Sequence, residues 1–386
     1  MTPARMRRAR PVSHALHAVS ARRLLLAGAG HSHVEVLRRF AMRPLERVDV
    51  TVVNPQPEFL YSAMVPGVVA GHYRADEAVI DVASLARRAG ATWREDSVAG
   101  LDLAERRARL ASGATIDFDI LALDVGAQPG IPIAAHPDVV AVRPFNDLLA
   151  RWERWRHEAI RGEIRSIVVV GGGAAGIELL LAMQFAIRSA RHAPEFVLVS
   201  DRLNLPHALD VRLGLILHAR GVRLSLGSPI RAVADGVVHR ADGATMSADR
   251  IVIATAGEGA RWLCASGLAC DERGSVMVDA ALRSTSHPFV FASGDCAALA
   301  HAPRPKAGVF AVREGPYVAH NLRATFANAP RRAYRPQQRW LAIVTTGERC
   351  AIAVRDRLAV SGRWTWHWKD RIDRAFVRRY APPGPR

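Results

Sequence analysis

Two copies of one strand–turn–helix unit constrain the fold of this chain more than any other feature of its sequence. The segments LLLAGAGHSHVEVL, from Leu24, and IVVVGGGAAGIELL, from Ile167, each run from an apolar strand through a glycine turn into a helix. A further apolar strand follows each unit, at residues 48–53 and 196–199. Two such β-α-β units in one chain predict an α/β protein with two parallel-sheet domains.

The second turn carries the full G-x-G-x-x-G pattern of a dinucleotide-binding turn. Gly171 permits the tight turn, Gly173 lets the backbone approach a pyrophosphate, and Gly176 lets the helix pack closely on the strand. The pyrophosphate would lie at the positive N-terminus of the helix. Because the motif has a strand before it and a helix after it, the turn predicts a nucleotide site.

The first turn keeps two of the three glycines. Gly28 and Gly30 can serve the phosphates, whereas His33 replaces the glycine that packs the helix on the strand. Access for phosphate is therefore retained, and we predict a second nucleotide site. His31 and His33 have no metal-ligating partners at a useful spacing. We therefore predict no metal site, and the roles left to these histidines are packing or a contact with cofactor phosphates.

The ends of the second strands bear on nucleotide preference. The first unit lacks the usual acidic residue and ends at Asn54, whose amide can still hydrogen-bond a ribose. The second unit ends in Asp201 and Arg202, of which the aspartate favours NADH and the arginine favours a 2′-phosphate. The choice between NADH and NADPH stays open.

Charge and cysteine content narrow the class of protein. Of the formal net charge of +17, residues 1–23 contribute +6 and residues 331–386 contribute +10, which leaves about +1 for residues 24–330. A neutral body without a recognition motif argues against nucleic acid as a partner. The four cysteines form no C-x-x-C pair, so we expect small buried side chains in a reducing, cytoplasmic setting.

Three short motifs connect the two units to a known superfamily. ALDVGAQPG after the first half, ATAG after the second and VFASGDCA near the end, together with both glycine turns, resemble the pyridine nucleotide–disulfide oxidoreductases over about residues 22–326. The resemblance implies two Rossmann-like domains of three-layer β-β-α architecture, with FAD at the first turn and NADH or NADPH at the second. It also implies that Gly126, Gly294 and Asp295 lie at the flavin, with Asp295 on its ribityl chain.

The same resemblance implies a division of the chain. The expected FAD-binding domain is discontinuous and comprises residues 22–145 and 272–330, and the expected NAD(P)H-binding domain comprises residues 146–271. A small C-terminal segment of residues 331–386 follows. We expect residues 1–21 to form a disordered basic tail.

A closer resemblance is carried by GAGHSHVEVLRRFAMRP, FLYSAMVPGVVAGHY, KAGVFAVREGP and GRWTWHWKDRID. These segments are similar to FAD-dependent proteins related to type II NADH dehydrogenases that occur fused to, or beside, selenophosphate synthetase. The resemblance implies an FAD-dependent NAD(P)H oxidoreductase that hands electrons to an acceptor, with a quinone as a candidate. The alternative is a flavin-binding accessory or redox-sensing partner of selenophosphate synthetase, in selenium metabolism, with little free turnover.

The resemblance also suggests site residues. Lys306 and the helix start at Ala307 and Val309 would stabilise negative charge on the reduced flavin. Glu178 matches a glutamate that lies near the nicotinamide in type II NADH dehydrogenases. Tyr61 belongs to a segment that approaches the flavin, where disulfide reductases carry a cysteine pair. This segment has no cysteine, so we predict an enzyme other than a disulfide reductase.

The last segment combines Trp364, Trp366 and Trp368 with several arginines. The tryptophans alternate as in a strand, and only the residues around Ile372 give a helical apolar face. Aromatic and basic residues together suit an anionic membrane surface. The alternative is a strand and a helix packed on the body or on a dimer partner. We expect a cytoplasmic protein, with peripheral attachment to the inner face of the membrane as an open alternative.

Overall fold

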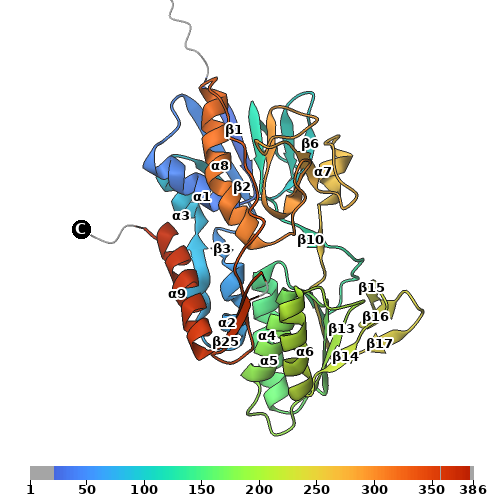
Figure 1. Ribbon diagram of the computed structural model, residues 1–386. Helices are drawn as coiled ribbons and strands as arrows, with labels where there is room; N and C mark the ends of the chain where they lie inside the picture. Colours follow the sequence, from blue (N-terminus) through green and yellow to red (C-terminus); the bar gives the residue numbers. More distant parts are fainter. Residues whose placement is uncertain (1–20, 357, 383–386) are drawn as a thin grey trace, which may run out of the picture.

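The computed structural model describes residues 21–356 and 358–382, and the upper lobe in Figure 1 is built on a parallel sheet. The strand order is β21-β9-β1-β2-β5, and every neighbouring pair is parallel. The strands are β1 (Arg22–Ala27), β2 (Val48–Asn54), β5 (Thr92–Glu95), β9 (Ile120–Leu123) and β21 (Val290–Ala292). Four consecutive residues of β1 and of β9 are buried, as in strands covered on both faces.

Helices cover one face of this sheet and a three-stranded meander covers the other (Figure 1). The helices are α1 (His31–Met42), α3 (Val82–Arg88) and α8 (Gly308–Phe326), and the meander comprises β6 (Val98–Asp102), β7 (Arg107–Leu110) and β8 (Thr115–Asp117). Helices α1 and α8 pack along each other. The predicted β-β-α layering is confirmed for this half.

The second half repeats the plan with a parallel sheet of order β11-β18-β12-β13-β14. Its strands are β11 (Val139–Ala141), β12 (Ser166–Val170), β13 (Glu195–Val199), β14 (Arg223–Ser225) and β18 (Arg250–Ile253). Its helices are α5 (Ala174–Ala186) and α6 (His207–Ala219), and its meander comprises β15 (Ile230–Ala234), β16 (Val237–Arg240) and β17 (Thr245–Ser247).

The chain crosses between the two halves earlier than expected, both on the way out and on the way back. The two crossings pair with each other as antiparallel strands β10 (Gln128–Pro129) and β19 (Gly257–Glu258). Strand β11 already belongs to the second sheet, and α7 (Arg261–Ala265) already packs on β6 of the first half. We therefore propose domain limits at this ribbon, in place of residues 145 and 272. The sequence carried no signal for a ribbon two residues long.

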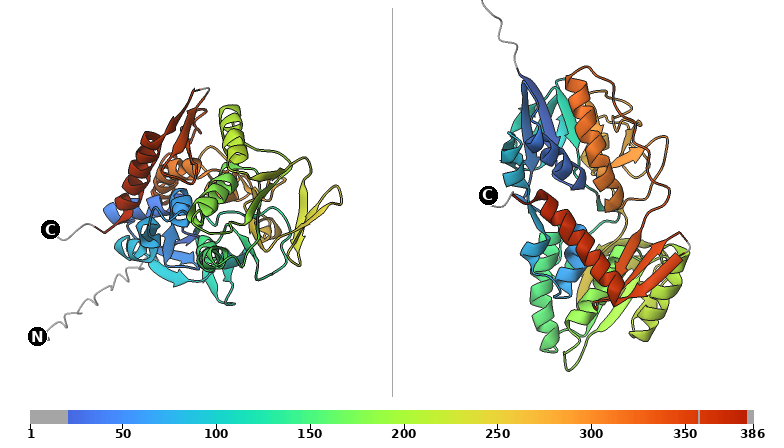
Figure 2. Two further views of the ribbon diagram at one scale, coloured as in Figure 1. Left: turned by 90° about the horizontal axis from the view of Figure 1, so that it is seen from below. Right: turned by 60° about the vertical axis from the view of Figure 1, so that its left-hand side comes forward.

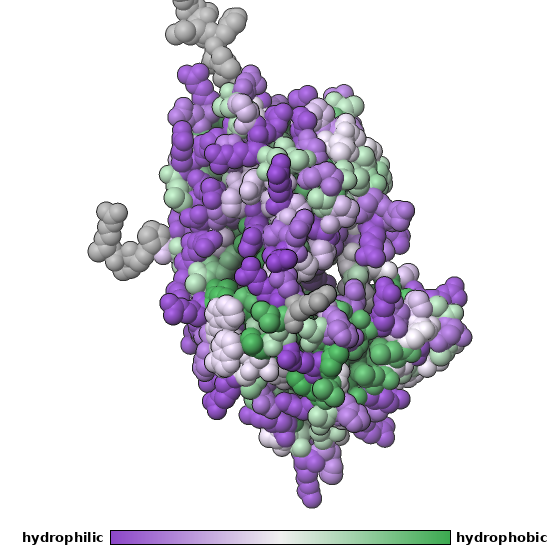
Figure 3. Space-filling model, in the orientation of Figure 1, coloured by the Kyte–Doolittle hydropathy of each residue, from purple (hydrophilic) through white to green (hydrophobic). Residues whose placement is uncertain are grey.

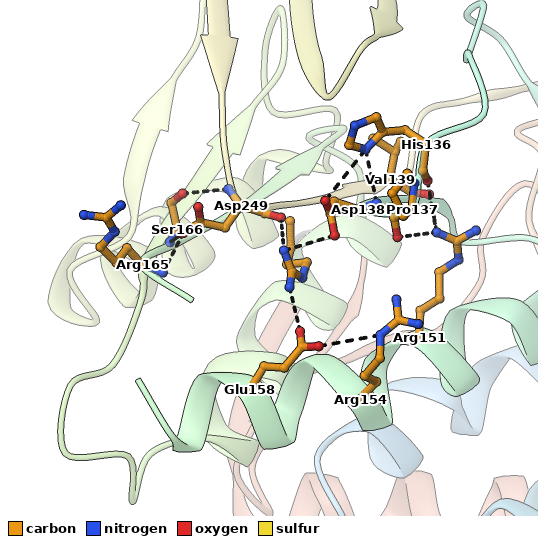
Figure 4. A network of polar contacts seen from close by, with 11 residues as sticks. His136, Pro137, Asp138, Val139, Arg151, Arg154, Glu158, Arg165, Ser166 and Asp249 are labelled. Atoms are coloured by element: carbon orange, nitrogen blue, oxygen red, sulfur yellow. Dashed lines mark hydrogen bonds and ion pairs between the residues drawn. The ribbon is translucent and has the colours of Figure 1, made fainter. Parts of the chain in front are cut away.

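Helix α4 (Phe145–Ile160) is fastened to the second sheet by a polar network (Figure 4). Arg250 on β18 pairs with Asp138 at 3.0 Å and with Glu158 of α4 at 2.7 Å. Arg151 of α4 donates to the carbonyl oxygens of residues 136, 137 and 139. These contacts hold the start of the second half against its sheet.

The C-terminal segment forms a three-stranded antiparallel sheet followed by a long helix. Its elements are β23 (Ala342–Thr345), β24 (Ala351–Arg355), β25 (Leu358–Gly362) and α9 (Arg363–Tyr380). In the right-hand view of Figure 2, α9 runs diagonally across both lobes. The expectation that the tryptophans lie on a strand is wrong. The strand ends at Gly362, and all three tryptophans lie on α9, where Trp366 faces the body and Trp364 and Trp368 face solvent.

Short elements complete the described chain. They are β3 (Glu58–Leu60), η1 (Ser62–Met64), α2 (Val65–Val69), η2 (Ala75–Ala78), β4 (Val79–Asp81), β20 (Val276–Val278), η3 (Gly294–Cys296) and β22 (Ala297–Leu299). The basic tail proposed for residues 1–21 lies, apart from residue 21, outside the described residues.

The expectation for the cysteines is wrong for three of the four. Only Cys296 is fully buried, while Cys350 is partly exposed. Cys264 and Cys270 are joined as a disulfide, with their Cα atoms 5.9 Å apart. They are six positions apart in the chain, and the turn at Gly267 brings the two ends of that loop together. Cysteine spacing carried no signal for this pairing.

Candidate active site

The two glycine turns have the same backbone construction. Gly28 has φ +83° and Gly171 has φ +128°, both outside the range that other residues readily adopt. A Cβ at Gly28 would overlap the carbonyl oxygen of Asp124, and a Cβ at Gly171 would overlap that of Ala254. Each turn therefore requires glycine because the neighbouring strand passes directly against it.

The second turn fits a nucleotide diphosphate. Gly173 caps the N-terminus of α5, and a Cβ placed there would meet no atom of the described residues within 4 Å. A Cβ at Gly176 would overlap the carbonyl oxygen of Gly171, which explains the close helix packing. The hydroxyl of Thr255, beside the turn, has no hydrogen-bond partner among the described residues. Open space, a helix N-terminus and a free hydroxyl together suit an anionic cofactor.

Asp201 and Arg202 follow β13 beside this turn. Their side chains are 51% and 79% exposed, and they lie 3.8 Å apart. Both therefore remain candidates for contacts with the cofactor ribose.

The side chains of His33 and Asn54 are hydrogen-bonded to the backbone of the first turn. His33 is fully buried, and its Nδ1 lies 2.6 Å from the carbonyl oxygen of Gly28. The Asn54 amide accepts a hydrogen bond from the backbone N–H of Ala29 at 3.0 Å and donates to Gln56. Burial lowers the pKa of His33 to about 4, so the ring is neutral. A neutral ring hydrogen-bonded to the turn replaces the packing glycine.

Asp295 lies at the N-terminal end of the convergent helices α1 and α8. Arg143 donates to its carboxylate at 2.7 Å. Burial acts to raise the pKa of Asp295, but the charge and hydrogen bond of Arg143, together with other nearby charges such as that of Lys306, hold the pKa below its ordinary value. The preceding Gly294 has φ +67° and donates its N–H to Glu314 at 2.7 Å. This turn thus presents an ionised carboxylate, which can accept hydrogen bonds from hydroxyl groups.

His31 lies in the same corner, partly buried against the rings of Phe59 and Tyr61. Burial and the Arg143 charge lower its pKa to about 4. The buried hydroxyl of Ser293 next to Gly294 has no hydrogen-bond partner among the described residues. A neutral imidazole, an ionised Asp295 and an unused hydroxyl fit a cofactor bearing a polyol chain. Gly126, with φ +73°, lies on the loop after β9, and a Cβ there would meet nothing within 4 Å.

Lys306 makes all of its hydrogen bonds within the protein, to one hydroxyl and two backbone carbonyl groups. Its Nζ donates to Ser275 Oγ and to the carbonyl oxygens of Asp295 and Ala297, each at 2.8 Å. All three ammonium hydrogens are therefore used, and burial lowers the pKa of Lys306. The structure gives Lys306 a position that supports the Asp295 turn. Its proposed charge effect on the flavin would act from there, together with the N-terminus of α8 at Ala307 and Val309.

Glu178 joins a polar group under α9 that includes residues from three distant parts of the chain. Its Oε1 accepts from the backbone N–H of Thr345 at 2.7 Å and from the Thr345 hydroxyl at 2.9 Å. Lys369 of α9 donates to Asp373 at 2.5 Å and to the carbonyl oxygen of Ala63 at 2.6 Å. Tyr61 neighbours Asp373 and stacks on Phe376, with ring centroids 4.3 Å apart. We call Tyr61, Glu178, Thr345, Lys369 and Asp373 the α9 cluster.

Burial sets the protonation of the α9 cluster. It raises the pKa of Glu178 and of Asp373, although the neighbouring Lys369 charge acts in the opposite direction. A small cavity beside the cluster is lined by Ala63, Gly67, Thr345, Trp366 and Lys369, among others. The cluster thus holds carboxyl groups that retain protons to higher pH than usual, next to a cavity with room for about one water molecule.

The family model for pyridine nucleotide-disulphide oxidoreductases matches residues 23–315, which include both turns and the Asp295 motif. The chain belongs to this family. Its cofactors are FAD and NAD(P)H, and the two turns described above are suited to hold them.

Relatives of several activities resemble the chain in part. Terpredoxin reductase of a Pseudomonas species is 30% identical over 54% of this chain, and the biphenyl dioxygenase system ferredoxin–NAD(+) reductase component of Paraburkholderia xenovorans is 32% identical over 60%. The chain spans 51% and 56% of those proteins. The NADH dehydrogenase-like protein YutJ of Bacillus subtilis is 22% identical over 73% of this chain and 78% of its own length.

The fold likeness extends farther than the sequence likeness. The sulfide:quinone oxidoreductase of Aquifex aeolicus superposes with a TM-score of 0.76 at 16% identity, over 93% of this chain and 91% of that one. Its coverage includes most of the C-terminal segment, which lies beyond the family match.

Sequence reasoning missed several residues of the site. Arg143 lies in none of the motifs named above. Lys369 and Asp373 were considered only as part of the basic C-terminal segment, residues 331–386. The rarity of lysine could have drawn attention to Lys369. Of the 53 lysine and arginine residues in the chain, only Lys306 and Lys369 are lysines. Asp124 lies inside the quoted ALDVGAQPG motif, and its carboxylate lies against the first turn.

Proposed function

We propose that this protein oxidises NADH or NADPH through FAD and passes the electrons to a quinone. The overall reaction would be NAD(P)H + H⁺ + quinone → NAD(P)⁺ + hydroquinone. When bound, FAD would supply the redox chemistry by accepting a hydride and returning two electrons. The single observation that carries the proposal is the α9 cluster.

The cluster favours an acceptor that takes up protons. A quinone needs two protons for its two electrons, whereas a ferredoxin takes one electron and no proton. Glu178 and Asp373 carry carboxyl groups with raised pKa, and Lys369 and Tyr61 add an ammonium and a phenol. Groups of this kind within reach of an acceptor act as general acids.

Each residue of the cluster would have a separate task. Lys369 would donate a hydrogen bond to an acceptor oxygen, directly or through a water molecule in the adjoining cavity. Asp373 would hold the Lys369 ammonium in place from one turn further along α9. Glu178 would hold a proton near the NAD(P)H side, on the helix that follows the second turn. Thr345 orients the Glu178 carboxylate through two hydrogen bonds.

A disulfide acceptor has no comparable support. Residues 61–66 contain no cysteine, and the fully buried Cys296 has no second cysteine beside it in the sequence. We therefore propose a route that differs from that of the disulfide reductases for which the family is named.

The surface around α9 supports access to a membrane-dissolved quinone. Of the eleven exposed large apolar side chains among the described residues, seven lie on α6, β25 and α9. They are Val211, Leu215, Leu358, Val360, Trp364, Trp368 and Ile372, which we call the apolar face. Figure 3 shows apolar side chains gathered where Figure 1 places β25 and α6. In the described residues no helix has the length and apolarity to cross a bilayer, so we propose peripheral contact.

Anaerobic spectroscopy tests the proposal. NADH or NADPH added to the FAD-loaded protein should bleach the flavin absorbance within seconds, and a water-soluble quinone added next should restore it. A flavin that stays oxidised would overturn the enzyme proposal and favour the accessory role beside selenophosphate synthetase. A reduced flavin that is reoxidised by a ferredoxin but not by quinones would overturn the proposed acceptor.

A further inference from the structure

The two glycine turns can be compared atom by atom, because they share one backbone plan. Gly28 N donates to the carbonyl oxygen of Val53 at 2.8 Å, and Gly171 N donates to that of Val199 at 2.8 Å. Asp124 N donates to Ala27 and Ala254 N donates to Val170, at 2.9 and 2.8 Å. Asp124 in the first half therefore stands at the place of Ala254 in the second.

This difference changes the space in front of the helix. A Cβ at Gly173 meets nothing within 4 Å, whereas a Cβ at Gly30 would lie 2.7 to 2.8 Å from the Asp124 carboxylate. Asp124 Oδ2 accepts hydrogen bonds from the backbone N–H groups of Ser32 at 2.8 Å and His33 at 2.9 Å. The first helix thus has a negative group at its N-terminus, where a phosphate would otherwise receive those two donors.

The surroundings of Asp124 are short of positive charge. Its side chain is buried, and the acids facing it are Glu314 on α8 and Asp295 on η3, with the Cys296 thiol alongside. The two nearby guanidiniums are paired elsewhere, Arg304 with Glu314 at 2.5 Å and Arg143 with Asp295 at 2.7 Å. The histidines of α1, His31 and His33, are neutral because burial lowers the pKa of each to about 4. Lys306 donates to the Ser275 hydroxyl and to the carbonyl oxygens of Asp295 and Ala297.

We infer that Asp124 is an internal anion of the first turn, and that FAD binding is coupled to uptake of one proton by its carboxylate. This inference rests on the assignment of FAD to the first turn. A diphosphate at the N-terminus of α1 would place further negative charge beside a buried carboxylate that no cation of the described residues pairs with. Protonation removes this repulsion and leaves an O–H group that can donate a hydrogen bond.

The pH range of the effect follows from linkage. Burial raises the pKa of Asp124 to about 7 before any cofactor binds, and the diphosphate would raise it further. Below that pKa the carboxyl already holds its proton, so FAD affinity is independent of this group. Above it, the dissociation constant for FAD should rise by about tenfold per pH unit until the pKa of the complex is reached.

Calorimetry counts the proton directly in the unaltered protein. The flavin-free protein is titrated with FAD at pH 8 in two buffers of different ionisation enthalpy, and the difference in heat gives the number of protons taken up. We expect close to one proton. FAD that binds without proton uptake would overturn this inference alone, whereas the absence of any binding would overturn the assignment of FAD itself.

Two variants assign the proton to its residue. Asp124→Asn retains an oxygen that can accept from Ser32 and His33 but cannot be ionised, so its FAD affinity should not change between pH 6 and pH 9. Asp102→Asn makes the same charge change on an exposed turn of the same half and should behave like the unaltered protein. Equal pH dependence in the Asp124→Asn variant and the unaltered protein would overturn the inference. If the Asp124→Asn variant does not fold, the proton count still decides.

Discussion

In the proposed function, a single side chain, that of Lys369, sets the chemistry of the acceptor site. Replacement by glutamine, Lys369→Gln, keeps a donor for the Ala63 carbonyl oxygen but removes the charge next to Asp373 and Glu178. We expect quinone reduction to fall by about 100-fold, the usual scale for loss of a positioned proton donor. Reduction of ferricyanide, which takes up no proton, should be unchanged. Steady-state rates with both acceptors provide the measurement.

The matched control for Lys369 is Arg363→Gln, a loss of one positive charge on the exposed side of α9. It should leave both rates unchanged. An equal loss of the quinone and ferricyanide rates in Lys369→Gln would instead indicate damage to the flavin site.

The nucleotide preference is also a property of single residues. Asp201 is half exposed beside the second turn, and its carboxylate would repel the 2′-phosphate of NADPH. Asp201→Ala should therefore raise the ratio of kcat/KM for NADPH to that for NADH by about tenfold, as loss of one such repulsion suggests. An exposed acid elsewhere in this half, Asp242→Ala, is the control. A ratio that does not move would show that Asp201 does not face the ribose.

At the scale of an element, two glycines of the second strand–turn–helix unit should have different roles. One should matter for the stability of the fold and the other for nucleotide binding. Gly171→Ala would force a Cβ into the carbonyl oxygen of Ala254 at a φ of +128°, so it should lower the melting temperature by several degrees. Gly173→Ala adds its methyl to open space, so the fold should keep its melting temperature. NADH binding should nevertheless weaken, because that space is where a diphosphate would approach the backbone.

Thermal unfolding and NADH titration of both variants check this pair. Equal melting temperatures for the two variants would contradict the packing argument at Gly171. Unchanged NADH affinity in Gly173→Ala would show that the nucleotide does not approach this turn.

At the scale of the whole molecule, the apolar face predicts an association with lipid surfaces. Trp364 and Trp368 are 56% and 39% exposed on α9 and stack on each other, with exposed Arg363 and Arg371 on the same helix. The protein should sediment with vesicles that contain anionic lipid, and high salt should weaken this binding. The double variant Trp364→Ser, Trp368→Ser should lose most of it.

Met42→Ser removes an exposed apolar side chain from α1, away from α6, β25 and α9 in the sequence, and serves as the control for lipid binding. It should bind vesicles like the unaltered protein. Equal binding of the tryptophan variant and this control would exclude the apolar face as the contact.

The sequence by itself determined the two repeated units, their order and the strand that follows each of them. These features depend on local physics: continuous apolar runs give buried parallel strands, and a turn that passes against a strand excludes any side chain but glycine. The helix from Gly308 and the strand ending at Asn54 fall within a residue or so of expectation. The alternating pattern W-x-W-x-W gave a wrong prediction, because it fits a strand by its period of two and a helix by the four-residue spacing of its outer tryptophans.

Only the tertiary structure decided which side chains meet. Ser32 and Asp124 are 92 positions apart, Arg143 and Asp295 are 152, and Thr345 and Glu178 are 167, yet each pair is in hydrogen-bond contact. The charge state of Asp124 and Glu178 likewise depends on burial, which no stretch of sequence specifies. Backbone turns are encoded by their own residues, whereas desolvation and ion pairing arise when distant segments pack together.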